Sequence, residues 1–131
     1  MSNLVGFEHI GMTSGDLDRT IAFYCDLLGL RLALRKPNLA FLDAGGGMLE
    51  VFGPEAGATT ARDVPQGEAG MRHLTLAYSD VDAMIDTLET AGVPILERPR
   101  DAHNTEMVRR VAFIRDPDGI IVELIERAPG R

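Results

Sequence analysis

The sequence predicts an α+β domain made of two copies of one unit, each with the order strand, helix and three strands (βαβββ). Three observations predict this class. Segments of the two halves resemble each other in the same order, each half holds one amphipathic helix with a start and stop signal, and each helix precedes short apolar runs separated by turns. A chain of 131 residues that is 45% hydrophobic and 25% charged is long enough to bury a core.

The internal repeat sets the expected domain organisation. FEHIGM at residues 7–12 aligns with MRHLTL at 71–76, and the later segments LAFL and MLEV align with VAFI and IVEL. The residues between the copies are rich in Gly, Ala and Pro and have no periodicity, which is typical of a connecting segment. We therefore expect a single domain over residues 1–131, with module one at about 4–54, a linker at about 55–70 and module two at about 71–127.

Each copy has one predicted helix, at residues 17–28 and 81–91. Asp16 and Asp80 are suited to cap the first turns, and Gly29 and Gly92 are suited to end the helices. Apolar residues recur at helical spacing on one face of each helix, so these faces should be buried. They are Leu17, Ile21, Tyr24 and Leu28 in the first helix and Val81, Met84, Ile85 and Leu88 in the second.

The three strands after each helix are predicted from short apolar runs and turn residues. The first of them should lie at residues 30–35 in copy one and 94–98 in copy two. Hairpin turns are expected at 43–47 and 116–119, where Asp, Pro and Gly suit tight reversals. The second copy is longer because of a polar segment from Arg98 to Met107, which we expect to be a loop.

Four polar residues of the predicted strands lie opposite the apolar face that packs against the helix. Side chains alternate between the two faces of a strand, so His9 and His73 should point away from the helix in their own copy. Glu50 and Glu123 likewise point away from the helix while lying inside apolar runs, where an unpartnered carboxylate is costly. Equivalent positions in both copies require one explanation.

We predict that His9, Glu50, His73 and Glu123 are the ligands of a divalent metal ion. Two neutral imidazoles and two carboxylates form a four-ligand set that leaves positions open for water or substrate. Any one of these residues alone is more often a satisfied or solvent-facing strand residue. Their repetition in register favours the metal site for the whole set.

Composition and charge restrict the partners. The net charge is −7 and the isoelectric point is about 4.8, so phosphate backbones and anionic lipid are repelled, and neither nucleic acid nor membrane is expected. The N-terminal residues carry no secretory signal pattern. Cys25 is the only cysteine, which is typical of a reducing compartment, and we expect a cytoplasmic protein that acts on a small molecule.

The repeated motifs resemble the vicinal oxygen chelate superfamily, which includes glyoxalase I, methylmalonyl-CoA epimerase, extradiol dioxygenases and the fosfomycin- and bleomycin-resistance proteins. The similarity covers roughly residues 5–126. It implies that the two βαβββ modules curl into an incomplete barrel around the metal, and that the protein is a homodimer. The phrases that carry it are FEHIGM, DLDRTIAFYCDLLGLRL, MRHLTLAYSDVDAMIDTLETAGV and FIRDPDGIIVELIE.

The ligand set resembles that of bacterial glyoxalase I. The ligand pattern of dioxygenases and fosfomycin-resistance enzymes is two His and one Glu, so they need no carboxylate at the position of Glu50. Epimerases usually carry Gln at that position. Bleomycin binders use an aromatic-lined groove, whereas this chain has 5% aromatic residues and no Trp. The resemblance implies a lyase or isomerase that abstracts a proton beside a carbonyl and forms a metal-stabilised enediolate, with Glu123 as the first candidate for the base and Glu50 as ligand or second acid/base.

The alternatives that stay open are an epimerase, an iron-dependent dioxygenase and a non-catalytic small-molecule-binding protein of the drug-resistance type. The ion is expected to be Ni²⁺, Co²⁺, Zn²⁺, Mn²⁺ or Fe²⁺. Glyoxalase I proteins grip glutathione with an Arg and an Asn at positions that hold Thr13 and Pro54 here, which argues against glutathione as the thiol. Arg98 and Arg100 are candidates for contacts with an anionic substrate, and His103 and Cys25 are assigned no role.

Overall fold

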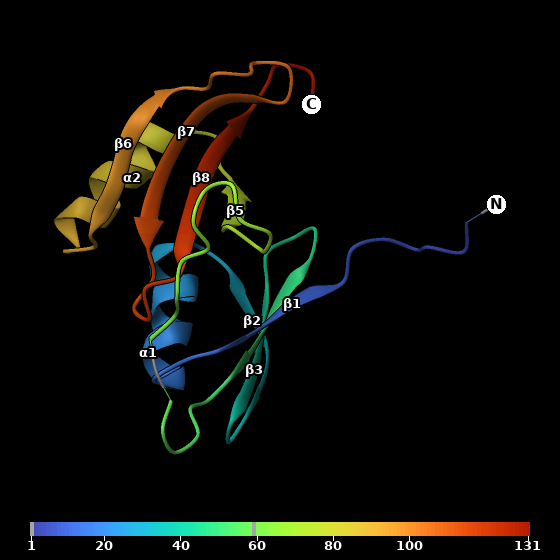
Figure 1. Ribbon diagram of the computed structural model, residues 1–131, viewed down its shortest axis with the longest axis vertical. Coiled ribbons are helices and arrows are strands. Elements are labelled where there is room, and N and C mark those ends of the chain that lie inside the picture. The colour runs from blue at the N-terminus through green and yellow to red at the C-terminus, as the bar shows by residue number, and fades with distance from the viewer. Residues whose placement is uncertain (1, 59) are drawn as a thin grey trace. The chain divides into compact units, whose positions relative to one another are not determined.

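The computed structural model describes residues 2–58 and 60–131, which form two compact units. Unit 1 comprises the described residues up to 58 and unit 2 those from 60 onward, and each is described by itself (Figure 1). Thr59, which falls within the predicted linker, lies outside the described residues. The domain and module boundaries given above stay predictions.

Each unit has the order strand, helix and three strands, as the sequence predicts. The short first helix of unit 1 continues into a π-helical turn. The elements of unit 1 are β1 (His9–Thr13), α1 (Leu17–Ala22), η1 (Phe23–Leu27), β2 (Arg31–Lys36), β3 (Leu39–Asp43) and β4 (Met48–Phe52). Those of unit 2 are β5 (Leu74–Ala77), α2 (Val81–Thr90), β6 (Ile95–Asp101), β7 (Val108–Arg115) and β8 (Ile121–Arg127).

The strands of each unit form one four-stranded mixed sheet. The strand order is β1-β4-β3-β2 in unit 1 and β5-β8-β7-β6 in unit 2. The first strand of each unit pairs in parallel with the last strand, and the other neighbours are antiparallel. Figure 1 shows α2 lying across one face of the sheet in its unit. Residues from opposite ends of each unit therefore become neighbours.

The predicted caps of both helices are confirmed. The carboxylate of Asp16 accepts a hydrogen bond from the Arg19 amide at 3.0 Å, and that of Asp80 accepts one from the Ala83 amide at 2.9 Å. Gly29 and Gly92 follow the helices with φ of 87° and 83°, a conformation that glycine adopts at low cost. Asp and Gly at these positions thus fix where each helix begins and ends.

The prediction of one regular α-helix over residues 17–28 is wrong in its second half. α1 ends at Ala22, and η1 follows it with the wider hydrogen-bond spacing of a π-helix, such as Leu28 N–H to Phe23 C=O at 3.1 Å. The wider turn allows Phe23 and Tyr24, which are neighbours in the sequence, to lie together in the core with their rings in edge-to-face contact. Helical periodicity alone does not reveal this inserted residue.

The polar segment predicted as a loop begins later than expected, because β6 extends to Asp101, opposite Arg110 of β7. Part of the predicted linker is also fixed within unit 2, since Asp63 accepts two hydrogen bonds of 2.9 Å from Arg115.

None of the helices in the described part of the chain is both long and apolar enough to cross a membrane. The largest fully buried side chains include Tyr24, Leu42 and Leu49 in unit 1 and Ile85, Leu88, Ile114 and Leu124 in unit 2.

Candidate metal centre

In unit 1 the parallel pairing of β1 with β4 brings the predicted ligands together. Gly11 lies opposite Glu50, and His9 precedes Gly11 by two residues on the same face of the strand. The distance from His9 Nε2 to Glu50 Oε1 is 3.6 Å. His9 Nδ1 faces a different carboxylate, Glu8 Oε1, at 3.5 Å. The imidazole therefore lies between two acidic side chains.

Unit 2 forms the equivalent pair where β5 meets β8, with His73 directly before the first residue of β5. Thr75 lies opposite Glu123, and His73 comes two residues before Thr75. His73 Nδ1 is 3.8 Å from Glu123 Oε1, and the hydroxyl of Thr75 lies between them, 2.9 Å from each atom. The second pair is thus bridged by a side chain that the first pair lacks.

A phenylalanine on the neighbouring strand contacts the histidine of each pair. Phe41 of β3 lies opposite Glu50, and Phe113 of β7 lies opposite Glu123. Their rings meet the His9 and His73 rings edge to face, with centroids 5.6 and 5.5 Å apart. Sequence reasoning gave these phenylalanines no role, although the alignment of LAFL with VAFI places both at the same position of the repeat. They limit how far each imidazole can turn.

The donor atoms in unit 1 fit a divalent ion. Two ligands bound at about 2.1 Å to one ion lie at most about 4.2 Å apart, so the separation of 3.6 Å between His9 and Glu50 allows both to bind it. Imidazole nitrogen and carboxylate oxygen suit Zn²⁺ and neighbouring transition metals. In unit 2 the same residue types lie close together, with Nδ1 of His73 occupied by Thr75. The joining of both pairs in one site stays a prediction.

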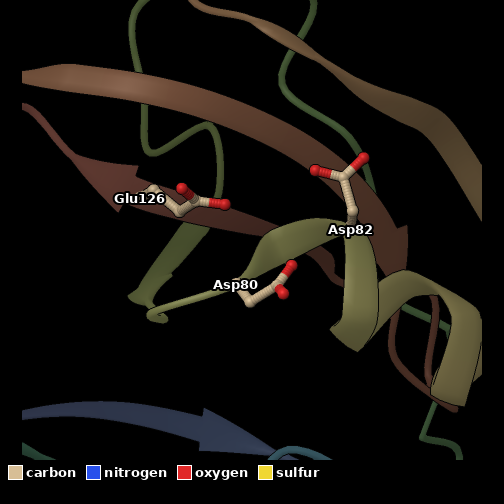
Figure 2. A group of neighbouring side chains, drawn as sticks. All are labelled: Asp80, Asp82 and Glu126. Atoms are coloured by element: carbon tan, nitrogen blue, oxygen red, sulfur yellow. The ribbon is translucent and has the colours of Figure 1, made fainter.

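A separate acidic cluster lies at the start of α2 (Figure 2). Asp80, Asp82 and Glu126 place carboxylate oxygens within 4.8 Å of one another. Asp80 caps α2, whereas Asp82 receives two hydrogen bonds of 2.7 Å from Arg110, which lower the pKa of its carboxyl group. Buried Glu126 accepts from the Val81 amide at 2.9 Å and from Arg109 Nε at 3.0 Å. These contacts explain the cluster as a helix cap and two ion pairs.

The other sequence candidates lie elsewhere in their units. Arg98 and Arg100 belong to β6 and form ion pairs with Glu89 and Glu97, respectively. His103 is exposed between β6 and β7. Burial raises the pKa of the Cys25 thiol, with a smaller contribution from Asp26, so this cysteine is in its protonated, less reactive form at neutral pH.

Thr13, one of the two departures from the glutathione pattern, ends β1. It lines an open pocket of about 430 Å³ together with Phe52 and Glu55; the remaining lining residues are Gly, Ala and Asn. Thr13 shares a strand face with His9, and Phe52 shares one with Glu50, since strand side chains alternate. The pocket therefore continues the strand face that carries the His–Glu pair of unit 1. Pro54, the second departure, follows β4 by two residues.

Two βαβββ units that each hold a His–Glu pair, with the His on the first strand or directly before it and the Glu on the last strand, define a class of duplicated α+β proteins. The family model of the Glyoxalase/Bleomycin resistance protein/Dioxygenase superfamily matches residues 6–124. The chain belongs to this superfamily, as its motifs predict.

Relatives with known names support this assignment. Lactoylglutathione lyase GLX1 of Arabidopsis thaliana is 30% identical over 94% of this chain, and the match covers 44% of that protein. Lactoylglutathione lyase of Haemophilus influenzae is 31% identical over 90% of each chain. The chain therefore spans less than half of the plant relative and most of the bacterial one.

A solved structure shows the same fold. The crystal structure of lactoylglutathione lyase from Agrobacterium tumefaciens is 28% identical in sequence, covers 95% of this chain and 96% of its own, and superposes with a TM-score of 0.69. The α+β fold class predicted from the repeat is thereby confirmed.

Proposed function

We propose that this chain is a divalent-metal-dependent lyase or isomerase of the glyoxalase I type. The observation that carries the proposal is the His–Glu pair that each unit forms where the beginning of its first strand meets its last strand. Relatives at about 30% identity are named lactoylglutathione lyase, which supports the same class of reaction. In this proposal His9, Glu50, His73 and Glu123 hold Ni²⁺, Co²⁺, Zn²⁺, Mn²⁺ or Fe²⁺.

In a hemithioacetal the reaction moves one proton from the carbon beside the carbonyl to the carbonyl carbon itself, and a second proton from the hydroxyl oxygen to the former carbonyl oxygen, which leaves a 2-hydroxy thioester. When bound, the ion supplies positive charge that offsets the negative charge developing on the substrate oxygens. Glu123 takes the proton from the carbon beside the carbonyl and returns it to the neighbouring carbon, so that no net proton is gained or lost. Its Oε1 accepts the Thr75 hydroxyl, which leaves Oε2 for the proton. Glu50 serves as ligand or as the second acid/base group.

The preferred substrate in this proposal is the adduct of a thiol other than glutathione. The support is the pocket beside Thr13 and Phe52, whose lining includes the carboxylate of Glu55 and neither Lys nor Arg. Glutathione carries two carboxylates, so it would meet a like charge there without a compensating cation. The small-molecule partner is therefore expected to be neutral or cationic in the part that enters this pocket.

Metal analysis of the purified chain tests the proposal. We expect about one divalent ion per chain in the wild type and none in the His9→Ala/His73→Ala double variant, because two of the four ligands are gone. A matched His103→Ala variant removes an exposed histidine outside the pairs and should keep the ion. A wild-type chain that binds no Ni²⁺, Co²⁺, Zn²⁺ or Mn²⁺ on titration contradicts the proposal and favours a non-catalytic binding protein.

Turnover separates the enzyme classes. The metal-loaded chain should convert hemithioacetals of several thiols, with glutathione among the poorer ones. Exchange of the α-proton of an acyl-CoA without conversion of hemithioacetals would favour the epimerase, and consumption of oxygen with Fe²⁺ would favour the dioxygenase. The proposal includes a homodimer in the cytoplasm, which sedimentation of the purified chain and fractionation of the source cells would test.

A further inference from the structure

The hydroxyl group of Thr75 connects the two predicted ligands of unit 2. Its Oγ1 lies 2.9 Å from Glu123 Oε1 and 2.9 Å from His73 Nδ1. The direct distance from His73 Nδ1 to Glu123 Oε1 is 3.8 Å, too long for a hydrogen bond. The imidazole and the carboxylate are therefore linked through Thr75 and not to each other.

The chemistry of the three groups fixes the direction of both hydrogen bonds. An ionised carboxylate only accepts, so Thr75 donates its single hydroxyl proton to Glu123. The hydroxyl oxygen can then only accept from the ring, so His73 must carry its proton on Nδ1. A neutral imidazole with a proton on Nδ1 has its lone pair on Nε2. The hydrogen-bond chain thus selects one tautomer of His73.

In unit 1 the corresponding ring nitrogen faces a different neighbour. His9 Nδ1 faces Glu8 at 3.5 Å, which leaves Nε2 toward Glu50. The repeat places Arg72 at the position of Glu8, and a guanidinium has no acceptor for a ring N–H. His73 therefore needs another acceptor for its Nδ1 proton. Thr75 supplies it from the position that Gly11 occupies in unit 1.

We propose that Thr75 is a positioning residue that holds His73 in the Nδ1–H tautomer, with Nε2 as its metal-binding atom, and that fixes the Glu123 carboxylate. Metal-binding histidines commonly donate their other ring N–H to a neighbouring group, which orients the ligand. The inference rests on the proposed metal site, because it assigns the ligand atom of one of its residues. The hydrogen-bond assignment itself can be tested without metal.

The first test reads the tautomer directly. Two-bond proton–nitrogen correlation spectra of the metal-free chain report which ring nitrogen is protonated, at a pH where the imidazole signals no longer move. The chain has three histidines, so His9→Gln and His103→Gln variants assign the signals. We expect Nδ1–H for His73 in the wild type and in Thr75→Ser, and a shift toward Nε2–H in Thr75→Val, which keeps the shape and removes the hydroxyl. Thr87→Val, at an exposed position of α2, is the matched control.

Two results would overturn the assignment. One is a wild-type His73 protonated on Nε2, and the other is a tautomer that does not change in Thr75→Val. Far-ultraviolet circular dichroism checks that each variant is folded. Should Thr75→Val fail to fold, Thr75→Ala removes the same hydroxyl with a smaller side chain and is expected to give the same shift.

The second test measures Co²⁺ binding by its visible absorption. Loss of the supporting hydrogen bond should weaken the affinity of Thr75→Val by about 10–100-fold, while Thr75→Ser should stay within a few-fold of the wild type. Equal or tighter binding by Thr75→Val would show that the ion uses Nδ1 and competes with Thr75, and would overturn the inference. A wild-type chain that binds no Co²⁺ overturns the proposed function instead, and the spectra of the metal-free chain still decide the tautomer.

Discussion

In unit 2 the carboxylate of Glu123 accepts a hydrogen bond from Thr75, whereas in unit 1 the equivalent Glu50 lies opposite Gly11, which has no side chain. Among the described residues the ion-pair neighbour of Glu50 is His9, whose Nε2 lies 3.6 Å from Glu50 Oε1. The His–Glu pair is thus common to both units, and the groups that support it differ. A duplicated unit can therefore keep its His–Glu pair while the surrounding residues change, so that the carboxylate of unit 2 accepts a hydroxyl hydrogen bond that Gly11 cannot donate in unit 1.

The largest difference between the two units is expected when the charge of each glutamate is removed in turn. Glu123→Gln should lower turnover of a hemithioacetal by about 10²–10⁴-fold, because the proposed base is lost. Glu50→Gln should cost less, since an amide oxygen can still bind the ion. Steady-state rates with matched metal content measure both effects. Equal losses in the two variants would contradict the assignment of the base to Glu123.

The cores of the two units offer a second comparison. Leu42 and Ile114 occupy equivalent positions of the repeat and are both fully buried. Replacement of either by Ala should lower the free energy of unfolding by about 2–5 kcal/mol, because methyl and methylene contacts are lost and a cavity remains. Urea denaturation measures the change. Leu96→Ala, on the exposed surface of β6, is the control and should change it by less than about 0.5 kcal/mol.

The helix caps should contribute similar amounts in both units. Asp16→Ala and Asp80→Ala each remove one side-chain acceptor from a first turn, so each should cost about 0.5–2 kcal/mol of stability. Asn at either position should restore most of the loss, because its amide oxygen also accepts from the backbone. Thermal unfolding of the four variants tests this. A larger loss for Ala that Asn does not restore would indicate a role other than capping.

Ser14 and Tyr78, which occupy equivalent positions of the repeat, differ in their response to pH. The amides of Ser14 and Tyr78 both donate to the neighbouring last strand, at 2.8 Å, but only Tyr78 titrates. Burial raises the pKa of Tyr78 to about 12, whereas an unfolded chain has a tyrosine pKa of about 10. The folded state therefore holds this proton more tightly, and the associated stability is complete below about pH 10 and is lost as the pH rises through about 12.

Urea denaturation between pH 9 and pH 12 should show this loss in the wild type, and Tyr78→Phe should remove it. The effect is expected to be modest, because the phenol is only partly buried. The ultraviolet difference titration of wild type against Tyr78→Phe isolates the ionisation of this one group. An ionisation near pH 10 would contradict the effect of burial.

The smallest change would make unit 1 resemble unit 2. A Cβ at Gly11 would lie 3.8 Å from Glu50 Oε1, an ordinary contact, so a serine fits. Gly11→Ser should raise stability by about 0.5 kcal/mol, because glycine in a strand loses more backbone entropy on folding. It should also give Glu50 a hydroxyl donor like that of Thr75. A lower melting temperature would show that the space at Gly11 is needed.

Much of the fold follows from local sequence signals. The repeat predicted the βαβββ order of both units, and Asp and Gly predicted where the helices begin and end. Strand alternation predicted that His9 and Glu50, and His73 and Glu123, lie on shared faces, and the nitrogen–oxygen distances of 3.6 and 3.8 Å agree with this, while the metal site stays a prediction. These features depend on single residues or on short periodic patterns, which a sequence displays directly.

Other features depend on contacts between distant residues and were not predicted. The π-helical turn η1 forms because Phe23 and Tyr24 are both accommodated in the core, which helical periodicity does not encode. The extension of β6 to Asp101 depends on pairing with β7. Thr75 lay on the predicted strand face. Its hydrogen bond to Glu123 requires the two residues to be direct partners on the neighbouring strands β5 and β8, and only the register of the sheet reveals this.

The parallel pairing of first and last strands has a consequence for synthesis of the chain. Because β1 lies beside β4, His9 can meet Glu50 only after the ribosome has produced the whole of that sheet. Because β5 lies beside β8, His73 must wait in the same way for Glu123, which is translated much later. The two His–Glu pairs therefore form one after the other, and a nascent chain that has formed the first pair still lacks two of the four proposed ligands.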